Sequence, residues 1–204
     1  MSSMPKSLFV SGTDTNVGKT FYSVEILKHL TKHLALNELA YYKPVQCGSD
    51  KDYDVIKQGL PGIATYTSYD LTCPASPDYA ARVDGVEISL ATIVDDFQEI
   101  QSKHKFVIVE GAGGLAVPLN DRDLVSDIAA SLGLPVVLVI SKELGTINHS
   151  LLTIEHARAR GIEIAGIIVS GLGDDDERTR ASIESIKKLG KVEEFNLALC
   201  LNKN

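Results

Sequence analysis

The amino-acid sequence predicts an α/β fold: a doubly wound, mostly parallel sheet with helices on both faces. Two observations support this prediction. Short apolar runs recur along the chain, and they are continuously hydrophobic rather than alternating, as strands buried on both faces should be. Helical stretches separate these runs, and strands that alternate with helices form parallel sheets.

The elements follow from their residue patterns. Five strands are expected, at Lys6–Ser11, Leu39–Lys43, Phe106–Glu110, Pro135–Ser141 and Ile164–Ser170. Between the first two, one face of a helix is indicated by the spacing of Ser23, Ile26, Leu27, Leu30 and Leu34. Between the last two, helical spacing is kept by Ile147, Leu151 and Ile154, and Gly161 should end that helix.

One region does not fit the alternation. Residues 47–85 are rich in Asp, Gly, Pro, Ser and Tyr, and they show only a short helical pattern near Asp54–Gln58. A long irregular insertion is usually functional, so we expect this one to border an active site. At 204 residues the chain is expected to form one domain, 1–204, that includes this insertion.

Composition narrows the class of protein. The net charge of -7 argues against a general nucleic-acid binder, which needs a cationic surface for phosphate backbones. Cys47, Cys73 and Cys200 are widely spaced and form no zinc pattern, which predicts a reducing compartment without structural disulfides. The first residues lack the apolar core of a signal peptide, and no apolar run is long enough for a membrane span. We therefore expect a soluble, cytoplasmic protein.

The first strand ends in a phosphate-binding pattern, Gly12–Thr20, which a helix follows at once. Backbone N–H groups of such a loop converge on a phosphate at the positive end of the helix, which predicts a P-loop nucleotide-binding fold. Lys19 would reach the β- and γ-phosphates, and the Thr20 hydroxyl would hold Mg²⁺. The loop is one residue longer than the strict pattern, because the first glycine is Gly12 and Thr13 stands at the usual position. The alternative is a capped helix after a glycine turn.

A second nucleotide motif follows the strand at Phe106–Glu110. That strand would place the Glu110 carboxylate at the C-terminal end of the strand. P-loop enzymes position Mg²⁺ there, and α/β sheets bind ligands at the same end. Gly111–Gly114 then allow a close backbone approach or a sharp turn. The alternative is that Glu110 only caps the next element.

Four motifs in order, spread over roughly Leu8 to Gly166, closely resemble those of the dethiobiotin synthetases. They are Gly12–Thr20, Tyr42–Val45, Glu110–Gly114 and Leu144–His149. The resemblance implies a ligase of biotin biosynthesis that joins 7,8-diaminononanoate, CO2 and ATP into dethiobiotin, ADP and phosphate. A carbamate forms on one amine, ATP phosphorylates it, and the second amine closes the ring.

The resemblance also implies which residues act. Lys19 and Lys43 would stabilise charge on the carbamate and the γ-phosphate as the catalytic residues; the alternative for Lys43 is a solvated lysine before a turn. Nucleotide binding would involve Thr15, Asn16, Val17, Gly18, Lys19, Thr20, Phe21, Asp54, Glu110, Gly111, Ala112, Gly113, Ser170 and Gly171. Mg²⁺ would be held by Thr20, Asp54 and Glu110, with Asp52 as the rival of Asp54 because the helical register near them is open.

Substrate binding is implied for Thr13, Lys43, Cys47, Gly145, Thr146, Ile147 and Asn148. Gly145–Asn148 opens a helix, so its free N–H groups can bind a carboxylate. In the family, that carboxylate comes from substrate held by the neighbouring subunit of a homodimer. A simple helix cap by Thr146 or Asn148 is compatible with this function.

The sequence departs from the family in four places. Cys47 stands where relatives carry Ser or Thr, and a thiol is the weaker hydrogen-bond donor. Ser170 stands where an asparagine often contacts the base, and the region after Gly190 is short, so we expect relaxed base selectivity. Asp78 stands where relatives often have histidine, and the sequence offers no physical account of that change.

Three other classes compete with the synthetase. A partitioning or metal-insertion ATPase would carry a second lysine at the position of Asp14. A cobyrinate-type amidase needs an additional glutaminase domain, for which 204 residues leave no room. A protein that binds nucleotide without catalysis is the third, and the retained Lys19, Lys43 and Glu110 weigh against it because buried charges are costly without a charged ligand.

Overall fold

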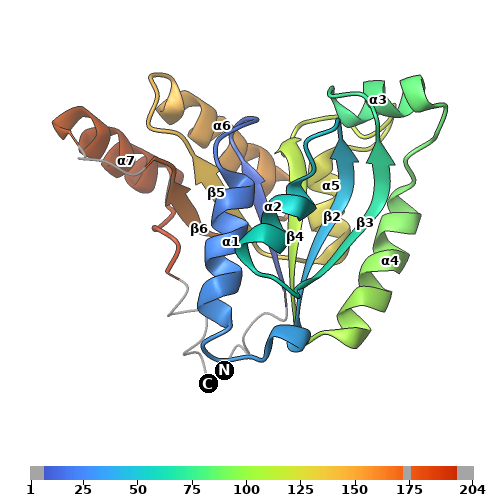
Figure 1. Ribbon diagram of the computed structural model, residues 1–204. Helices are drawn as coiled ribbons and strands as arrows, with labels where there is room; N and C mark the ends of the chain where they lie inside the picture. Colours follow the sequence, from blue (N-terminus) through green and yellow to red (C-terminus); the bar gives the residue numbers. More distant parts are fainter. Residues whose placement is uncertain (1–6, 172–175, 197–204) are drawn as a thin grey trace.

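Six parallel strands form one sheet in the computed structural model, which describes residues 7–171 and 176–196 (Figure 1). In chain order the elements are β1 Ser7–Gly12, α1 Lys19–Leu30, the short 3-10 helix η1 Leu36–Glu38, β2 Leu39–Cys47, α2 Asp52–Gly59, β3 Ala64–Leu71, α3 Pro77–Asp84, α4 Leu90–Lys103, β4 Phe106–Gly114, α5 Val125–Leu132, β5 Val136–Ile140, α6 Thr146–Ala159, β6 Ile164–Val169 and α7 Glu177–Gly190. The strand order is β3-β2-β4-β1-β5-β6, and every pairing is parallel. The predicted α/β class is confirmed.

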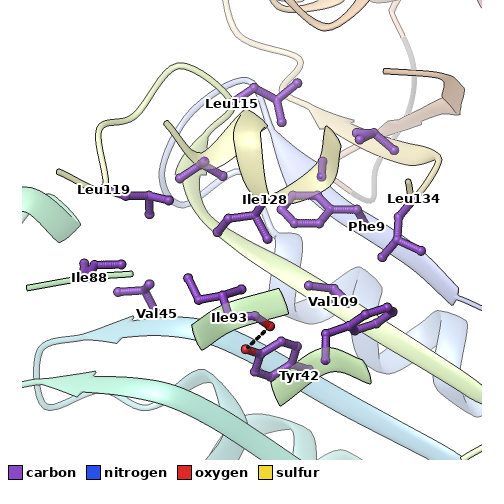
Figure 2. Packing of buried hydrophobic residues seen from close by; sticks show 14 of the residues in the cluster. Phe9, Tyr42, Val45, Ile88, Ile93, Val109, Leu115, Leu119, Ile128 and Leu134 are labelled. Carbon is purple, nitrogen blue, oxygen red and sulfur yellow. Dashed lines mark hydrogen bonds between the residues drawn. The ribbon is translucent and has the colours of Figure 1, made fainter. Parts of the chain in front are cut away.

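Helices cover both faces of the sheet, because consecutive residues of the central strands point to opposite sides. In β1, Leu8 and Val10 pack with α1 and α2 on one face, while Phe9 packs with α4 and α5 on the other. Figure 2 shows Phe9 in the hydrophobic cluster on the face covered by α4 and α5. In the same cluster the Tyr42 hydroxyl donates to the Ile93 carbonyl at 3.3 Å. At the β5–β6 end of the sheet, α6 and α7 pack against each other.

All five predicted strands are present. In residues 47–85 the short helix expected near Asp54–Gln58 is present as α2, and the segment borders the cavity described below, but the expectation of otherwise irregular structure is wrong. That segment contains α2, the edge strand β3 and α3 rather than irregular structure. The sequence of β3 mixes Thr, Tyr and Ser with few aliphatic residues, because this strand pairs only with β2 and is mostly half-buried. It therefore lacks the continuous apolar run that marked the other strands.

The two predicted helices are confirmed with shifted ends. The first ends at Leu30, four residues before Leu34, which lies partly buried beyond the helix. The second runs to Ala159, and Gly161 follows with a φ of 70°, as expected for a left-handed residue after a helix. Within the described ranges, no helix is both long and apolar enough to span a bilayer.

Candidate active site

The carboxyl ends of β1, β2 and β4 are neighbours in the sheet, and a cavity of about 730 Å³ opens beside them. β1 leads into the loop before α1, β2 carries Lys43, and β4 carries Glu110. The sheet order therefore brings together three motifs that lie up to 90 residues apart in the sequence. Parallel α/β sheets bind ligands at this edge.

The loop between β1 and α1 has the backbone of a phosphate cradle. Asn16 and Gly18 have φ angles of 60° and 95°, in the left-handed region that turns successive N–H groups inward. A side chain at Gly12 would meet Val17 at 2.5 Å, so the loop needs glycine there. The Lys19 ammonium donates to the Asp14 carbonyl at 2.8 Å and folds back over the loop.

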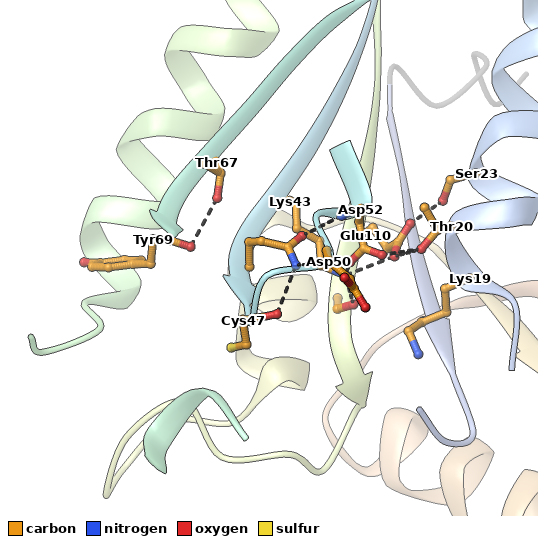
Figure 3. A network of polar contacts seen from close by, with 12 residues as sticks. Lys19, Thr20, Ser23, Lys43, Cys47, Asp50, Asp52, Thr67, Tyr69 and Glu110 are labelled. Carbon is orange, nitrogen blue, oxygen red and sulfur yellow. Dashed lines mark hydrogen bonds and ion pairs between the residues drawn. The ribbon is translucent and has the colours of Figure 1, made fainter. Parts of the chain in front are cut away.

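A buried network of charges lies next to this loop (Figure 3). The Lys43 Nζ atom is 2.7 Å from Asp52 Oδ2 and 3.0 Å from Glu110 Oε1. The Thr20 hydroxyl is within hydrogen-bond distance of the same two carboxylates, 2.7 Å from Asp52 and 3.0 Å from Glu110. Ser23 donates to the other oxygen of Glu110 at 2.8 Å. The network joins α1, α2, β2 and β4.

The pKa values of the two buried lysines shift in opposite directions. Burial opposes the charge of Lys43, but the carboxylates of Glu110 and Asp52 outweigh it, and the pKa of Lys43 is raised. Burial and the neighbouring charge of Lys43 lower the pKa of Lys19. Burial also opposes the charge of Asp52, yet the Lys43 ammonium keeps the pKa of this carboxyl below its ordinary value. Lys43 and Asp52 are therefore a charged pair that faces a second, less well compensated lysine.

Asp52, and not Asp54, belongs to this network, so the expectation for Asp54 is wrong. Both lie in the first turn of α2. Asp54 is exposed and does not line the cavity, whereas Asp52 lines it and contacts Lys43 and Thr20. Two residues along a helix correspond to a rotation of about 200°, which points the two side chains in opposite directions.

Most of the residues singled out from the sequence line the cavity. They are Thr15, Asn16, Gly18, Lys19, Thr20, Phe21, Lys43, Cys47, Glu110, Ala112 and Gly113. Three others lie just behind its wall: Thr13 bonds Val139 through its backbone N–H, Val17 packs in the core, and the Gly111 carbonyl accepts from Lys43 at 3.1 Å. Their backbone atoms shape the site even though they do not line the cavity.

Ser170 and Gly171 follow β6 and lie outside the cavity, on the far side of the phosphate loop. A side chain at Gly18 would meet the Ser170 hydroxyl at 3.1 Å, which places Ser170 beside the start of α1. The Tyr22 hydroxyl donates to the Val169 carbonyl at 3.0 Å and ties α1 to the end of β6. This location adjoins the phosphate loop, as a base-binding position would.

Gly145–Asn148 also lies outside the cavity of its own chain. Gly145 precedes α6 with a φ of 101°, and the buried Thr146 hydroxyl donates to the Ser141 carbonyl at 2.7 Å. Asn148 is exposed, and Leu144 beside it is 91% exposed. Gly145 and Asn148 are thus exposed, Thr146 is buried, and none of the residues 145–148 lines the cavity that contains Lys43.

Sequence reasoning missed Gln46, which is 3% exposed and lines the cavity. Its amide nitrogen donates to the carbonyls of Cys47 and Asp50 at 3.2 and 3.1 Å, and its oxygen accepts from the N–H of Asp52 at 3.0 Å. These bonds hold the turn between β2 and α2, so Gln46 sets where Asp52 begins the helix. A polar residue in an otherwise buried strand was the signal available in the sequence.

Cys47 lines the cavity at the end of β2, as expected, and it is half-buried. Burial raises the pKa of its thiol to about 11, against a partly offsetting effect of Lys43. The group is therefore a neutral thiol near neutral pH, which suits contact with substrate and not nucleophilic attack. Val45, from the motif Tyr42–Val45, also lines the cavity, and other lining residues to which the sequence assigned no role are Asp50, Pro74, Ala75, Ser76, Pro77 and Val117.

The oxygens of Thr20, Asp52 and Glu110 form a donor set that fits a magnesium ion. Mg²⁺ prefers hard oxygen ligands, usually one or two carboxylates together with substrate phosphates and water. The two carboxylates converge on one hydroxyl at 2.7 and 3.0 Å. The part of the chain that the structure describes contains no group of three or more His, Cys, Asp or Glu residues suited to a metal ion held by protein alone. The residues present suit a cation that arrives with nucleotide.

Comparison with known proteins points to one group. A family profile described as an AAA domain matches residues 6–197. The ATP-dependent dethiobiotin synthetase of Methanococcus aeolicus is 38% identical over 192 residues, covering 91% of this chain and 90% of the relative. The synthetase of the same description from Afipia carboxidovorans is 40% identical over 197 residues, covering 93% and 88%.

Solved structures of similar shape include more distant P-loop proteins. The MinD cell division protein of Aquifex aeolicus aligns with a TM-score of 0.59 at 15% identity, covering 93% of this chain and 80% of its own. A ParA family ATPase from Chlorobium tepidum aligns with the same TM-score at 12% identity, covering 93% and 83%. At such identities the likeness establishes the fold alone. The sequence relatives, which match at more than twice those identities, distinguish among the activities that this fold supports.

Proposed function

This chain belongs to the ATP-dependent dethiobiotin synthetase family, and we propose from this premise that the family's reaction takes place in the cavity beside β1, β2 and β4. The reaction is a carbon–nitrogen ligation in biotin biosynthesis: 7,8-diaminononanoate, CO2 and ATP give dethiobiotin, ADP and phosphate. The observation that supports this location is Lys43, buried between two carboxylates and next to the phosphate loop.

The chemistry explains why two lysines lie at one site. A carbamate is a poor electrophile until one of its oxygens is phosphorylated, and this step brings together two anions that repel each other. Lys19, which closes over the phosphate loop, binds the γ-phosphate of ATP. Lys43 stabilises the carbamate and the charge that develops during phosphoryl transfer. Its two carboxylate partners keep it protonated for this purpose.

Thr20, Asp52 and Glu110 hold a magnesium ion in this proposal. Bound there, the ion neutralises charge on the phosphates of ATP. The chain's own contribution is to orient these oxygens: Ser23 fixes Glu110 from α1, and Gln46 fixes the backbone of Asp52. Such supporting hydrogen bonds usually matter nearly as much as the ligands themselves.

Substrate and nucleotide also contact residues beyond the charge network in this proposal. Cys47 and the backbone near Thr13 lie beside the diamine, and the carboxylate of the diamine reaches the start of α6 at Gly145–Asn148. Because this helix start lies outside its own chain's cavity, it serves the site of a second copy in a homodimer. Ser170 and Gly171 lie on the side of the phosphate loop where the base binds. The reducing environment indicated by the cysteines supports action in the cytoplasm.

The test is phosphate release from ATP with Mg²⁺ and bicarbonate, measured with and without 7,8-diaminononanoate. We expect release that requires the diamine and that falls by at least about 100-fold in Lys43→Ala, since a buried stabiliser of transition-state charge contributes about that much. Lys28→Ala is the matched control, because Lys28 lies on the solvent side of α1 and, within the described part of the chain, forms an ion pair with Glu25 alone. Diamine-independent hydrolysis, or none, would refute the proposal.

A further inference from the structure

A large aromatic side chain is exposed at the phosphate loop. Phe21 lies in the first turn of α1, directly after Thr20, and it lines the cavity while it is 49% exposed. Single exposed apolar residues are common on protein surfaces, but this one borders the site where the nucleotide is proposed to bind. Taking an aromatic ring out of water is favourable, so a ligand that covers Phe21 gains affinity from it.

The ring lies on the side of the cavity where a nucleoside would leave the phosphate loop. Cys47 and residues 74–77 line the cavity near β2 and β3, against which α3 packs, whereas α1 packs against β1 and β4. In a phosphate loop, backbone N–H groups at the start of the helix hold the α- and β-phosphates. Because the α-phosphate carries the nucleoside, the ribose and base would emerge beside the first turn of α1, which contains Phe21.

Phe21 is connected to the end of β6 through the ring of Tyr22. The two rings are perpendicular with centroids 5.1 Å apart, so Tyr22 covers at most one face of Phe21. Tyr22 is itself held by its hydrogen bond to Val169. A side chain at Gly18 would meet the Tyr22 ring at 3.6 Å and the Ser170 hydroxyl at 3.1 Å. These residues form a continuous border from the cavity to the end of β6.

Of the described residues at the end of β6, neither Ser170 nor Gly171 can distinguish strongly between bases. The Ser170 N–H already donates to the Ile140 carbonyl at 2.7 Å, which leaves the hydroxyl. A hydroxyl can donate or accept, so it fits the edges of different bases, and Gly171 has no side chain. Stacking on an aromatic ring also suits every base, because each base has a π-face.

We propose that Phe21 is the stacking surface for the base, and that the protein therefore binds purine and pyrimidine nucleoside triphosphates with similar affinity. The phosphate loop holds the triphosphate, and the open face of the ring covers the base. The inference rests on the proposed function in one respect, that the cavity binds a nucleoside triphosphate. It gives the relaxed base selectivity expected from the sequence a physical cause in a named side chain.

The test is calorimetric binding of non-hydrolysable ATP, GTP and CTP analogues with Mg²⁺, together with tripolyphosphate as a probe that has no base. The wild-type affinities for the three analogues should differ by less than about tenfold, because stacking tolerates every base. Phe21→Ala should weaken all three by about tenfold, a typical effect of losing one stacked base. Its affinity for tripolyphosphate should stay the same, because the phosphate loop is intact.

Two further substitutions at this position separate stacking from simple burial. Phe21→Tyr keeps the ring and should bind all three analogues as the wild type does. Phe21→Leu keeps an apolar side chain without a π-face and should lose most of the affinity that Phe21→Ala loses. Val55→Ala is the matched control, because Val55 on α2 is 48% exposed and does not line the cavity. It should change no affinity.

Three results would overturn the inference. The first is a wild-type protein that strongly prefers one base. The second is an equal loss of tripolyphosphate affinity in Phe21→Ala, which would mean that the ring only shapes the phosphate loop. The third is unchanged nucleotide affinity in Phe21→Ala with a raised KM for the diamine, which would place the ring against the diamine.

Binding and turnover separate this inference from the proposed function. A protein that binds the analogues but releases no diamine-dependent phosphate would refute the proposed function, while the calorimetry would still decide the stacking. A protein that shows diamine-dependent release with ATP but binds no other base would keep the proposed function and overturn the inference. A protein that binds none of the analogues would overturn both.

Discussion

Asp52 and Asp54 have opposite surroundings although they lie two residues apart in the first turn of α2. Asp52 bonds Lys43 and Thr20 inside the cavity, whereas Asp54 is exposed on the other side of the helix. Both carboxylates lie near the positive end of the helix, where a negative charge is favourable. Only Asp52 lines the cavity in which we propose that the reaction takes place.

We expect Asp52→Asn to lower the kcat/KM of diamine-dependent phosphate release by about 10- to 100-fold, because the amide keeps the shape but removes a negative charge from the magnesium and Lys43 site. Asp54→Asn should change it less than about twofold, as surface substitutions usually do. The concentration of Mg²⁺ needed for half-maximal rate should rise in the first variant only. Equal losses in the two variants would contradict the assignment.

The sequence could identify the ligand type but not the register. The sequence predicted a carboxylate at the start of this helix, and the structure has Asp52 in the cavity. The choice between Asp52 and Asp54 depended on where α2 begins. That start is set by the hydrogen bond from the Asp52 N–H to the Gln46 side chain, a contact across the turn that helical periodicity cannot reveal. By contrast, the sequence indicated the positions of Lys43 and Glu110, because each directly follows an apolar run, although β2 and β4 continue four residues beyond them. Lys19 was indicated by the recognisable pattern Gly12–Thr20.

At the scale of elements, burial determined which strands could be predicted. The runs Leu8–Val10 of β1, Phe106–Val109 of β4 and Val136–Ile140 of β5 are buried on both faces, so they are continuously apolar and leave one interpretation. β3 has a neighbour on one side only and carries alternating Thr and Tyr residues. Its place in the sheet comes from pairing with β2, which no local pattern encodes.

Helix α7 depends on a titratable cap. The Asp176 side chain accepts from the Thr179 N–H at 2.7 Å, and the hydrogen bonds from Thr179 lower the pKa of this carboxyl below its ordinary value of 3.8. A depressed folded pKa contributes stability above the unfolded pKa, and that stability is lost as pH falls through the folded value. At neutral pH, Asp176→Ala should lower the melting temperature by about 2–4 °C, the usual effect of losing a cap in a chain of this size.

Asp176→Asn separates the cap from its charge. Asparagine caps a helix about as well as aspartate and does not titrate, so this variant should match the wild type at pH 7. Below pH 3.8 the wild type should lose the contribution of its cap while the variant keeps it, so their melting temperatures should diverge, with the variant the more stable. Parallel curves over the whole pH range would show that the charge of Asp176 does not support α7.

At the scale of the whole molecule, the proposed reaction uses two regions that lie apart in one chain. The cavity contains Lys19, Lys43 and the oxygens proposed to hold magnesium, while Gly145–Asn148 at the start of α6 does not line it. The sequence could indicate both sites through their motifs. It could not show that they are separate within one chain, because that separation depends on where β5 and α6 lie relative to β2. A second copy would supply the missing anion site.

This arrangement predicts complementation between two defective variants. Lys43→Ala removes a catalytic group, and Asn148→Asp places a negative charge where the carboxylate of the diamine would bind while still suiting the start of α6. Asn148 is exposed, so the change should leave the fold intact. Each variant alone should be strongly impaired at low diamine concentration.

Mixed subunits should regain activity, because every heterodimer contains one site with Lys43 from one chain and Asn148 from the other. Random exchange makes half of the dimers mixed, each with one intact site of two, so about a quarter of the wild-type rate should return. Light scattering would report the dimer that this requires, and a control mixture of Lys43→Ala with Asp52→Asn should regain nothing, because both changes fall in the same half-site. Activity that stays at the average of the two variants would mean that each chain works with its own α6 or with none.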